Sequence, residues 1–310
     1  MSEVRRIMGK TAFIFPGQGA QVCGMGQDFY ENSETAKAVF DRATELLGFS
    51  VPELCFEKND RLDITEYTQA AMVTTSIAMM KVMEERGIHA DVAAGLSLGE
   101  YCALVAAGVM TADDAIRTVR ERGILMQEAV PAGVGGMSAV LGMTADEINA
   151  VVDEIPNVQV ANYNCPGQLV IAGEKAALAE AIENCKAAGA RRALPLAVSG
   201  AFHTPLMAEA AAELRAFVSD FTFSAPTMDI YSNLDGQVYD CSNLPEHLEQ
   251  HMISPVRWTR LVQNGMAAGL TSACEVGPGK TLTGFAGKIS KELTCKTVQD
   301  MAGVQAAAEA

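Results

Sequence analysis

Apolar and polar positions along the chain form blocks that are typical of short strands followed by helices. Residues 11–15 are an apolar run that the sequence PGQG ends, which predicts a buried strand entering a glycine-rich turn. Residues 68–87 are rich in alanine and methionine and close at Gly87, which predicts a long helix with a glycine C-cap. Residues 90–108 predict a short strand, a tight turn and a buried helix, and another helical pattern begins at Thr111.

The pattern changes near residue 131. From there to residue 198 the order strand, helix, strand, strand, helix, strand is that of a split βαβ, ferredoxin-like unit. We therefore predict an α/β fold in which residues 1–129 and 199–310 form one body with a mostly parallel sheet, and residues 130–198 form an inserted small subdomain. The low-complexity tail after Val298 is expected to be frayed or weakly helical.

Composition narrows the class of protein. The 310 residues are 49% hydrophobic and 20% charged, as in a globular protein with a sizeable core. The formal charge of −15 argues against nucleic acid or an anionic membrane as a partner. No apolar stretch is long enough to span a membrane, and the N-terminus lacks a signal-peptide pattern, so we expect a cytoplasmic protein. The eight cysteines have neither disulfide-scaffold nor zinc spacing, and we expect reduced thiols and no bound metal.

Two glycine-rich segments resemble nucleotide-binding motifs but fail on spacing. The segment GQGAQVCGMG has Val22 where the G-x-G-x-x-G fingerprint needs its third glycine. The segment GPGKT would need glycine at Cys274 to complete a P-loop. Neither motif therefore predicts a nucleotide cofactor.

The segment Gly95-Leu96-Ser97-Leu98-Gly99 fits the G-x-S-x-G pattern of a nucleophile elbow. An apolar strand precedes it and a helix follows it, as the elbow requires. The glycines permit the sharp turn that exposes the Ser97 hydroxyl, and the Leu98 N–H then points toward the oxygen of an attacked carbonyl. The alternative is a turn serine that caps a helix.

A serine nucleophile needs a base, and the chain has only four histidines. His203 is the best candidate because it lies in a loop at the exit of the inserted segment, where a cleft between two domains is expected. His89 lies near a helix end and is predicted at the surface, and His247 and His251 lie in a polar stretch that would equally well face solvent. No single carboxylate stands out to orient the base, and a backbone carbonyl could serve instead.

Arg122 is the other distinctive side chain. The periodicity of the helix that begins at Thr111 places Arg122 at the edge of the apolar stripe, whereas Arg117 and Arg120 point away from it. A guanidinium near a buried face needs an anionic partner. That partner is either an internal carboxylate or the carboxylate of a substrate, which a guanidinium binds in bidentate fashion.

Taken together, these segments resemble the malonyl-CoA:acyl-carrier-protein transacylases, the acyltransferases of bacterial fatty-acid synthesis. The resemblance runs through nearly all of the chain in matching order. It is carried by FPGQGAQ at 15–21, GLSLGEYCALVAAG at 95–108, RERGILMQEAVP at 120–131, ANYNCPGQLVIAG at 161–173, GAFHTPLM at 200–207, SPVRW at 254–258 and EVGPGKTLTG at 275–284.

The resemblance implies an α/β-hydrolase-like body with an inserted ferredoxin-like subdomain, and it implies roles for six residues. These are Ser97 as the acylated nucleophile, His203 as its base, Gln18 and Leu98 as backbone N–H donors of the oxyanion hole, Arg122 as the malonyl carboxylate clamp, and His251 as the residue whose main-chain carbonyl orients the base. Two positions depart from the family pattern: Leu96 stands where many relatives have histidine, and His251 where the family often has glutamine.

The implied reaction is a ping-pong transfer from malonyl-CoA to acyl carrier protein that requires no metal or redox cofactor. Because acyl carrier protein is acidic, a local basic patch is expected, for it or for the CoA phosphates. The candidates are Arg191, Arg192, Lys280 and Lys288. Three alternatives stay open: a trans-acting polyketide-pathway acyltransferase, a serine hydrolase or thioesterase on the same elbow, and a non-catalytic subunit that binds carrier protein.

Overall fold

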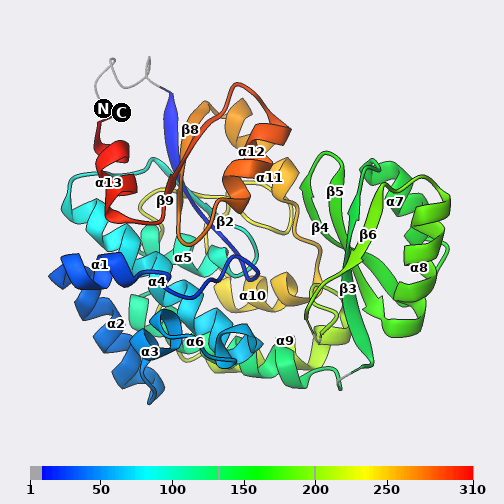
Figure 1. Cartoon of the computed structure of the whole chain (residues 1–310), viewed down its shortest axis with the longest axis horizontal. Helices are drawn as coiled ribbons and strands as arrows, with labels where there is room; N and C mark the ends of the chain where they lie inside the picture. Colours follow the sequence, from blue (N-terminus) through cyan, green and yellow to red (C-terminus); the bar gives the residue numbers. More distant parts are fainter. Residues whose placement is uncertain (1–8, 132, 199, 310) are drawn as a thin grey trace.

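Two β-sheets with their covering helices organise the structure, a computed structural model that describes residues 9–131, 133–198 and 200–309 (Figure 1). The elements in chain order, with η for 3₁₀ turns, are β1 (Lys10–Phe15), α1 (Gln27–Asn32), α2 (Glu34–Leu47), α3 (Val51–Phe56), η2 (Arg61–Asp63), α4 (Thr65–Glu85), β2 (Val92–Gly95), α5 (Gly99–Ala106), α6 (Ala112–Glu128), β3 (Gly135–Leu141), α7 (Ala145–Val152), β4 (Val158–Cys165), β5 (Gln168–Glu174), α8 (Lys175–Ala187), β6 (Arg192–Pro195), η3 (Pro205–Met207), α9 (Ala208–Val218), β7 (Asp229–Ile230), α10 (Leu244–Ile253), α11 (Trp258–Ala267), β8 (Leu270–Val276), α12 (Thr281–Ile289), β9 (Thr294–Val298) and α13 (Met301–Ala308).

The larger sheet, sheet A, has the strand order β7-β2-β1-β8-β9, and every pairing in it is parallel. The central strands β1, β2 and β8 end at Phe15, Gly95 and Val276, so their carboxyl ends lie at one edge. Ligands of parallel α/β sheets bind at such an edge. The predicted mostly parallel sheet is confirmed, and its carboxyl edge is where a site is expected.

Helices cover both faces of sheet A because side chains alternate along each strand. On β1, Phe13 and Phe15 belong to the main core, which also contains residues of α1 to α6, α9 and α10. Ala12 and Ile14 point to the opposite face and pack with residues of α11 and α12. Strand β1 is therefore buried on both faces, which explains the unbroken apolar run in its sequence.

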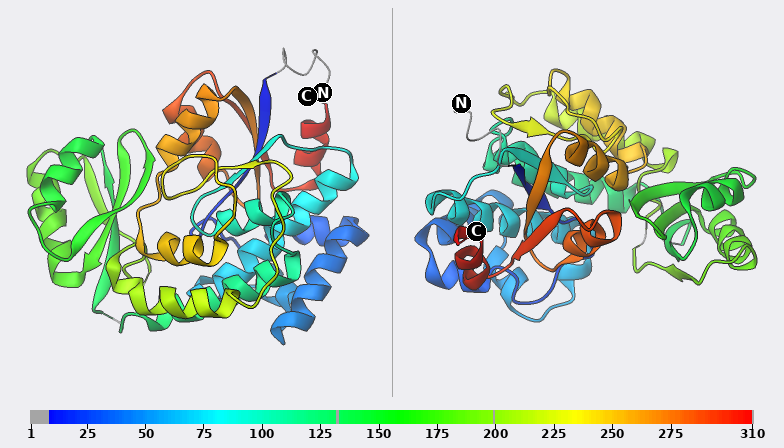
Figure 2. Two further views of the ribbon diagram at one scale, coloured as in Figure 1. Left: turned by 180° about the vertical axis from the view of Figure 1, so that it is seen from behind. Right: turned by 90° about the horizontal axis from the view of Figure 1, so that it is seen from above.

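The smaller sheet, sheet B, is antiparallel with the order β4-β5-β3-β6. This arrangement confirms the predicted ferredoxin-like pattern, and its last strand, β6, is short and ends at Pro195. Helices α7 and α8 pack on one face, while Met137 and Val170 on the other face join the main core. Seen from above, sheet B and its helices stand beside sheet A (Figure 2). The domain division at residues 130–198 stays a prediction.

The C-terminal tail differs from the prediction of a frayed or weakly helical segment. It forms α13, whose N-terminus is capped by Asp300 through a 2.7 Å hydrogen bond from the Gly303 N–H. The Met301 N–H donates to the Asp28 carboxylate at 2.7 Å, and Val304 is fully buried. One apolar contact and two capping bonds therefore order a segment whose sequence has little amphipathic pattern.

All eight cysteines lie in the described ranges as free thiols. Among the helices of residues 9–131, 133–198 and 200–309, none combines the length and the apolar character that crossing a bilayer requires.

Candidate active site

Ser97 lies in the turn between β2 and α5, at the carboxyl edge of sheet A. Its backbone is left-handed, with φ of +50°, as is typical of a strained functional turn. The flanking glycines are required by close packing: a Cβ on Gly95 would lie 1.9 Å from the Gly99 carbonyl carbon, and a Cβ on Gly99 would lie 2.1 Å from the Phe15 carbonyl oxygen. The geometry is that of a nucleophile elbow.

Asn233, in the loop after β7, holds this turn in place. The Ser97 N–H donates to Asn233 Oδ1 at 2.8 Å, and Asn233 Nδ2 donates to the Gly95 carbonyl at 2.7 Å. The side-chain amide therefore satisfies backbone groups on both sides of the left-handed residue. Sequence reasoning missed Asn233, because a polar residue in a loop carries no periodic signal.

The structure brings Ser97 and His203 together. Ser97 Oγ lies 2.7 Å from His203 Nε2, and His203 Nδ1 lies 2.9 Å from the main-chain oxygen of His251. A carbonyl oxygen can only accept, so Nδ1 carries the proton and Nε2 of the neutral ring is free to accept from the Ser97 hydroxyl. His203 is itself left-handed, with φ of +60°, and Gln159 on β4 donates to its carbonyl at 2.8 Å.

The electrostatic surroundings keep the His203 imidazole neutral. Burial, followed by the neighbouring His251 and Arg122, lowers the pKa of His203 well below its usual value of 6.5. At neutral pH the ring is therefore unprotonated and able to accept a proton from Ser97.

Arg122, on α6, is 1% exposed, and its guanidinium points toward Ser97. Its Nη1 donates to Gln69 Oε1 at 2.8 Å, its Nη2 lies 3.4 Å from Ser97 Oγ, and its Nε has no hydrogen-bond partner. No carboxylate of the described residues forms an ion pair with it. The internal ion pair that the sequence left open is therefore not formed within those residues, and the guanidinium faces the serine with unused donors.

Gln18 and Leu98, the predicted oxyanion-hole residues, lie in adjoining loops. The loop after β1 passes so close to the elbow that a Cβ on Gly17 would lie 2.6 Å from the Leu96 carbonyl oxygen. Gln18 is held by its side chain, which donates to Thr65 Oγ1 at 3.2 Å. The backbone N–H groups of Gln18 and Leu98 donate to no acceptor within the described residues, so both are available to a ligand.

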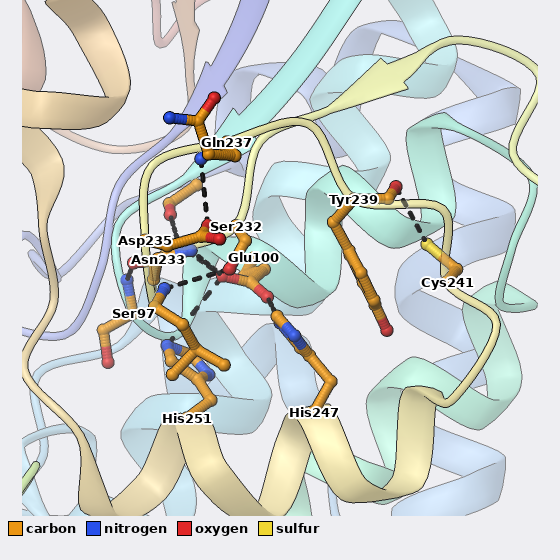
Figure 3. A network of polar contacts seen from close by, with 12 residues as sticks. Ser97, Glu100, Ser232, Asn233, Asp235, Gln237, Tyr239, Cys241, His247 and His251 are labelled. Carbon is orange, nitrogen blue, oxygen red and sulfur yellow. Dashed lines mark hydrogen bonds and ion pairs between the residues drawn. The ribbon is translucent and has the colours of Figure 1, made fainter. Parts of the chain in front are cut away.

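His247 and His251 correct an expectation drawn from the sequence. The polar stretch that contains them folds as α10, and its inward face buries both rings, leaving His247 8% and His251 0% exposed. His247 Nε2 lies 2.5 Å from Oε1 of Glu100, a carboxylate that is itself fully buried (Figure 3). The sequence left a solvent-facing position open for both histidines, and the structure rules it out because α10 covers an internal acid.

Glu100 and Gln69 are functional-site residues that sequence reasoning missed. A detectable signal existed for Glu100, since it is the only acid in the apolar helix α5 and a buried acid requires partners. Gln69 lies on α4, whose residues are buried on nearly every side, so periodicity could not single it out. His89, by contrast, is exposed as expected.

A cavity of about 440 Å³ opens near the start of α4, and the predicted site residues are not among those that line it. Its walls include Thr65 at the start of α4, Gln127 at the end of α6 and Val198 in the segment after β6. Thr65 also contacts Gln18, so the cavity lies beside the loop that faces Ser97. The described residues contain no group of three or more metal-ligating side chains.

Known proteins that resemble this chain are enzymes of acyl transfer. The family model for the acyl transferase domain matches residues 12–305. The chain belongs to this acyl transferase family. Among curated proteins, it is 43% identical over 299 residues to the malonyl CoA-acyl carrier protein transacylase of Bacillus subtilis, covering 94% of each chain. It is 41% identical over 306 residues to that of Salmonella typhimurium, covering 97% of this chain and 99% of the relative.

The solved structures that resemble this acyl transferase are enzymes of the same kind. An acyl carrier protein S-malonyltransferase from Vibrio cholerae matches with a TM-score of 0.92 and 41% identity, over 96% of this chain and 99% of that one. A malonyl-transacylase solved in complex with a type II PKS acyl-carrier protein matches with a TM-score of 0.94 and 38% identity, over 97% and 99%. Both structures therefore share the whole architecture of this acyl transferase.

Proposed function

We propose that this acyl transferase moves the malonyl group of malonyl-CoA to the phosphopantetheine thiol of acyl carrier protein through an ester on Ser97. The observation that carries the proposal is the fully buried Arg122 guanidinium, which faces Ser97 Oγ and has no carboxylate partner within the described residues. A cation held in this way needs an anion from outside the chain. A malonyl thioester supplies a carboxylate beside the reacting carbonyl.

In the first half-reaction, neutral His203 takes the Ser97 proton as Oγ attacks the thioester carbonyl. The negative charge that develops on the carbonyl oxygen is stabilised by the N–H groups of Gln18 and Leu98. Collapse of the intermediate expels the CoA thiolate, which the His203 imidazolium protonates. These proton transfers require the His203 tautomer that carries its proton on Nδ1, and the main-chain oxygen of His251 stabilises that tautomer.

In the second half-reaction the same groups act in reverse. The phosphopantetheine thiol gives its proton to His203 and attacks the malonyl-Ser97 ester, and Ser97 recovers its proton when the ester bond breaks. Arg122 keeps the malonyl carboxylate in place through both steps. The cavity beside Thr65 is the space we assign to the arm of the thioester.

The partners are therefore malonyl-CoA and acyl carrier protein, and the proposed role is to supply fatty-acid elongation in the cytoplasm. Free thiols at all eight cysteines support a reducing compartment. Among the four basic residues suggested for carrier-protein contacts, Arg191 and Arg192 are exposed at the start of β6. Lys288 donates to Gln168 on β5, and β3 lies between β5 and β6.

One other transferase role is favoured by a specific observation. The structural relative solved with a carrier protein has a type II PKS carrier as its partner, at 38% identity over the whole fold. Transfer to a polyketide carrier in trans is therefore the second candidate. The unpaired guanidinium beside the nucleophile favours a charged acyl group, and it therefore disfavours a hydrolase or thioesterase for uncharged acyl groups.

A pulse and chase with radiolabelled malonyl-CoA tests the proposal. The label is expected on Ser97 after the pulse and on fatty-acid acyl carrier protein after the chase, with a polyketide carrier protein charged more slowly. Faster charging of the polyketide carrier would favour the second candidate. Release of free malonate without carrier protein would show a hydrolase.

A further inference from the structure

Glu100 is a buried carboxylate that the proposed chemistry does not use. It lies in the first turn of α5, three residues after Ser97, and is 0% exposed. A buried charge is costly unless several donors satisfy it. Figure 3 shows what surrounds Glu100: the Asn233 loop on one side and the helix α10 on the other.

One carboxylate oxygen is bound to the loop that holds the nucleophile. Glu100 Oε2 accepts the Asn233 backbone N–H at 3.0 Å and also accepts from Asn233 Nδ2. The same asparagine accepts the Ser97 N–H and donates to the Gly95 carbonyl. Glu100 thus fixes the asparagine that holds the elbow in its left-handed conformation.

The other oxygen is bound to the helix that orients the base. Glu100 Oε1 lies 2.5 Å from His247 Nε2. His247 lies one helical turn before His251 on α10, and the main-chain oxygen of His251 accepts from His203 Nδ1. The His251 ring lies between Glu100 and His203. Its Nε2 is 4.0 Å from Glu100 Oε2, and its ring centroid is 5.5 Å from the centroid of the His203 ring.

We infer that Glu100 is a positioning residue that couples the two halves of the Ser97–His203 pair, through Asn233 to the nucleophile and through His247 and α10 to the carbonyl that orients the base. No other side chain of the described residues forms hydrogen bonds with both Asn233 and His247. At Oε2 both contacts come from N–H donors of Asn233, which an ionised carboxylate accepts, and an ionised Oε1 in turn requires that His247 Nε2 carry a proton.

Electrostatics agree with this assignment. Burial by itself raises the pKa of Glu100, but His251, His247 and the Asn233 N–H together outweigh burial and bring the pKa to about 2. Glutamine in this place keeps the shape but turns one acceptor into an NH₂ group that faces N–H donors. Glu100→Gln should therefore weaken both arms without opening a cavity, because one arm loses its acceptor and the other loses the charge that strengthens its hydrogen bonds.

The inference rests on the proposed function, so its test uses two reagents. The first is malonyl-CoA, with the single-turnover rate of Ser97 acylation followed by intact mass. The second is methanesulfonyl fluoride, a small electrophile that reports the reactivity of the Ser97–His203 pair without any malonyl recognition. If the wild-type enzyme takes up the sulfonyl group but no malonyl group, the proposed function fails, and the sulfonylation series still decides the role of Glu100.

Glu100→Gln is expected to lower both rates by about 10²-fold, the scale of a small misplacement of reacting groups. Malonyl-CoA affinity, measured in a Ser97→Ala background, is expected to stay unchanged because the Arg122 contacts are intact. Glu275→Gln is the matched control: Glu275 is also 0% exposed and accepts two backbone N–H groups, but at the start of α12. It should lose stability and keep both rates.

Coupling is tested by a double-mutant cycle. His247→Gln should slow sulfonylation in the wild-type background and have little further effect in Glu100→Gln. Asn233→Ala should cost less in Glu100→Gln than in the wild-type background, and the loss that remains there is that of its own bonds to Ser97 and Gly95. Equal losses in the two backgrounds, or an unchanged rate in folded Glu100→Gln, would overturn the inference. Should Glu100→Gln fail to fold, the single variants decide, since an unchanged rate in either one removes its arm.

Discussion

The two sheets differ sharply in what they bury. Sheet B and its helices have an aliphatic core, and their buried polar residues are Ser138 and Asn164. The body around sheet A contains every buried acid, arginine and histidine of the described residues. These are Glu100, Arg122, His203, His247, His251 and Glu275.

The backbone shows the same contrast. Within the described part of the chain, the only left-handed residue other than glycine in the sheet B segment is Asn157, a type that tolerates this conformation in turns. In the body, the left-handed residues include Ser97 and His203, for which the conformation is strained. Backbone strain and buried charge therefore concentrate where the carboxyl ends of the parallel strands meet. The antiparallel sheet mainly contributes apolar side chains that pack against the main core.

Removing the nucleophile has the largest expected effect and tests whether the chemistry lies in the body around sheet A. Ser97→Ala is expected to abolish the malonyl adduct, because no cysteine or second serine occupies an equivalent position at the elbow. Intact-mass analysis after brief exposure to malonyl-CoA measures the adduct. An adduct that persists in the variant would remove Ser97 from the role and move the chemistry elsewhere.

Removing the base has the next largest expected effect. His203→Ala should slow acylation by about 10²–10⁴-fold, the usual contribution of a general base. The wild-type rate should stay level from pH 8 down to pH 6.5 and fall only below it, because the His203 pKa lies well below 6.5 and protonation removes the base. A rate that rises as the pH falls would contradict a neutral imidazole base.

Within the described part of the chain, Gln159 is the one side chain of sheet B that forms a hydrogen bond with Ser97 or His203, so it tests how little that sheet contributes. Gln159→Ala removes the hydrogen bond to the His203 carbonyl, worth about 1 kcal/mol, and should slow acylation by about fivefold. Stopped-flow acylation provides the measurement. A loss as large as that of His203→Ala would show that sheet B does more than close the site.

His251→Gln is expected to change acid stability more than rate. The pKa of His251 falls to about 4, chiefly through burial, so the folded state resists protonation and stability is lost as the pH drops from 6.5 toward 4. Glutamine does not titrate, and the variant should lose about 1 kcal/mol less between pH 7 and pH 5.5. Urea unfolding at both pH values checks this. Identical pH dependence in the two proteins would count against a buried neutral imidazole.

Much of this organisation could be predicted from the sequence. Period and turn signals located both sheets, and the glycines around Ser97 indicated the elbow because close packing demands glycine there. Helical periodicity placed Arg122 near the buried stripe. Asn233 and His247 could not be found in this way, since their roles depend on contacts between segments more than a hundred residues apart. Glu100 is signalled as the only acid of an apolar helix, but its partners could not be predicted for the same reason. The polar sequence around His251 was misleading because a helix can bury histidines against an internal acid.

The central claim is that an unpaired buried guanidinium selects the malonyl group, and the ratio of kcat/KM for malonyl-CoA to that for acetyl-CoA tests it most directly. Arg122→Ala should lose malonyl transfer by about 2–4 kcal/mol and little or no acetyl transfer, with Arg122→Lys in between because lysine restores the charge but not the fork. Circular dichroism checks folding. If both substrates fall in parallel in a folded Arg122→Ala, the arginine is structural, and the account of malonyl selection is wrong.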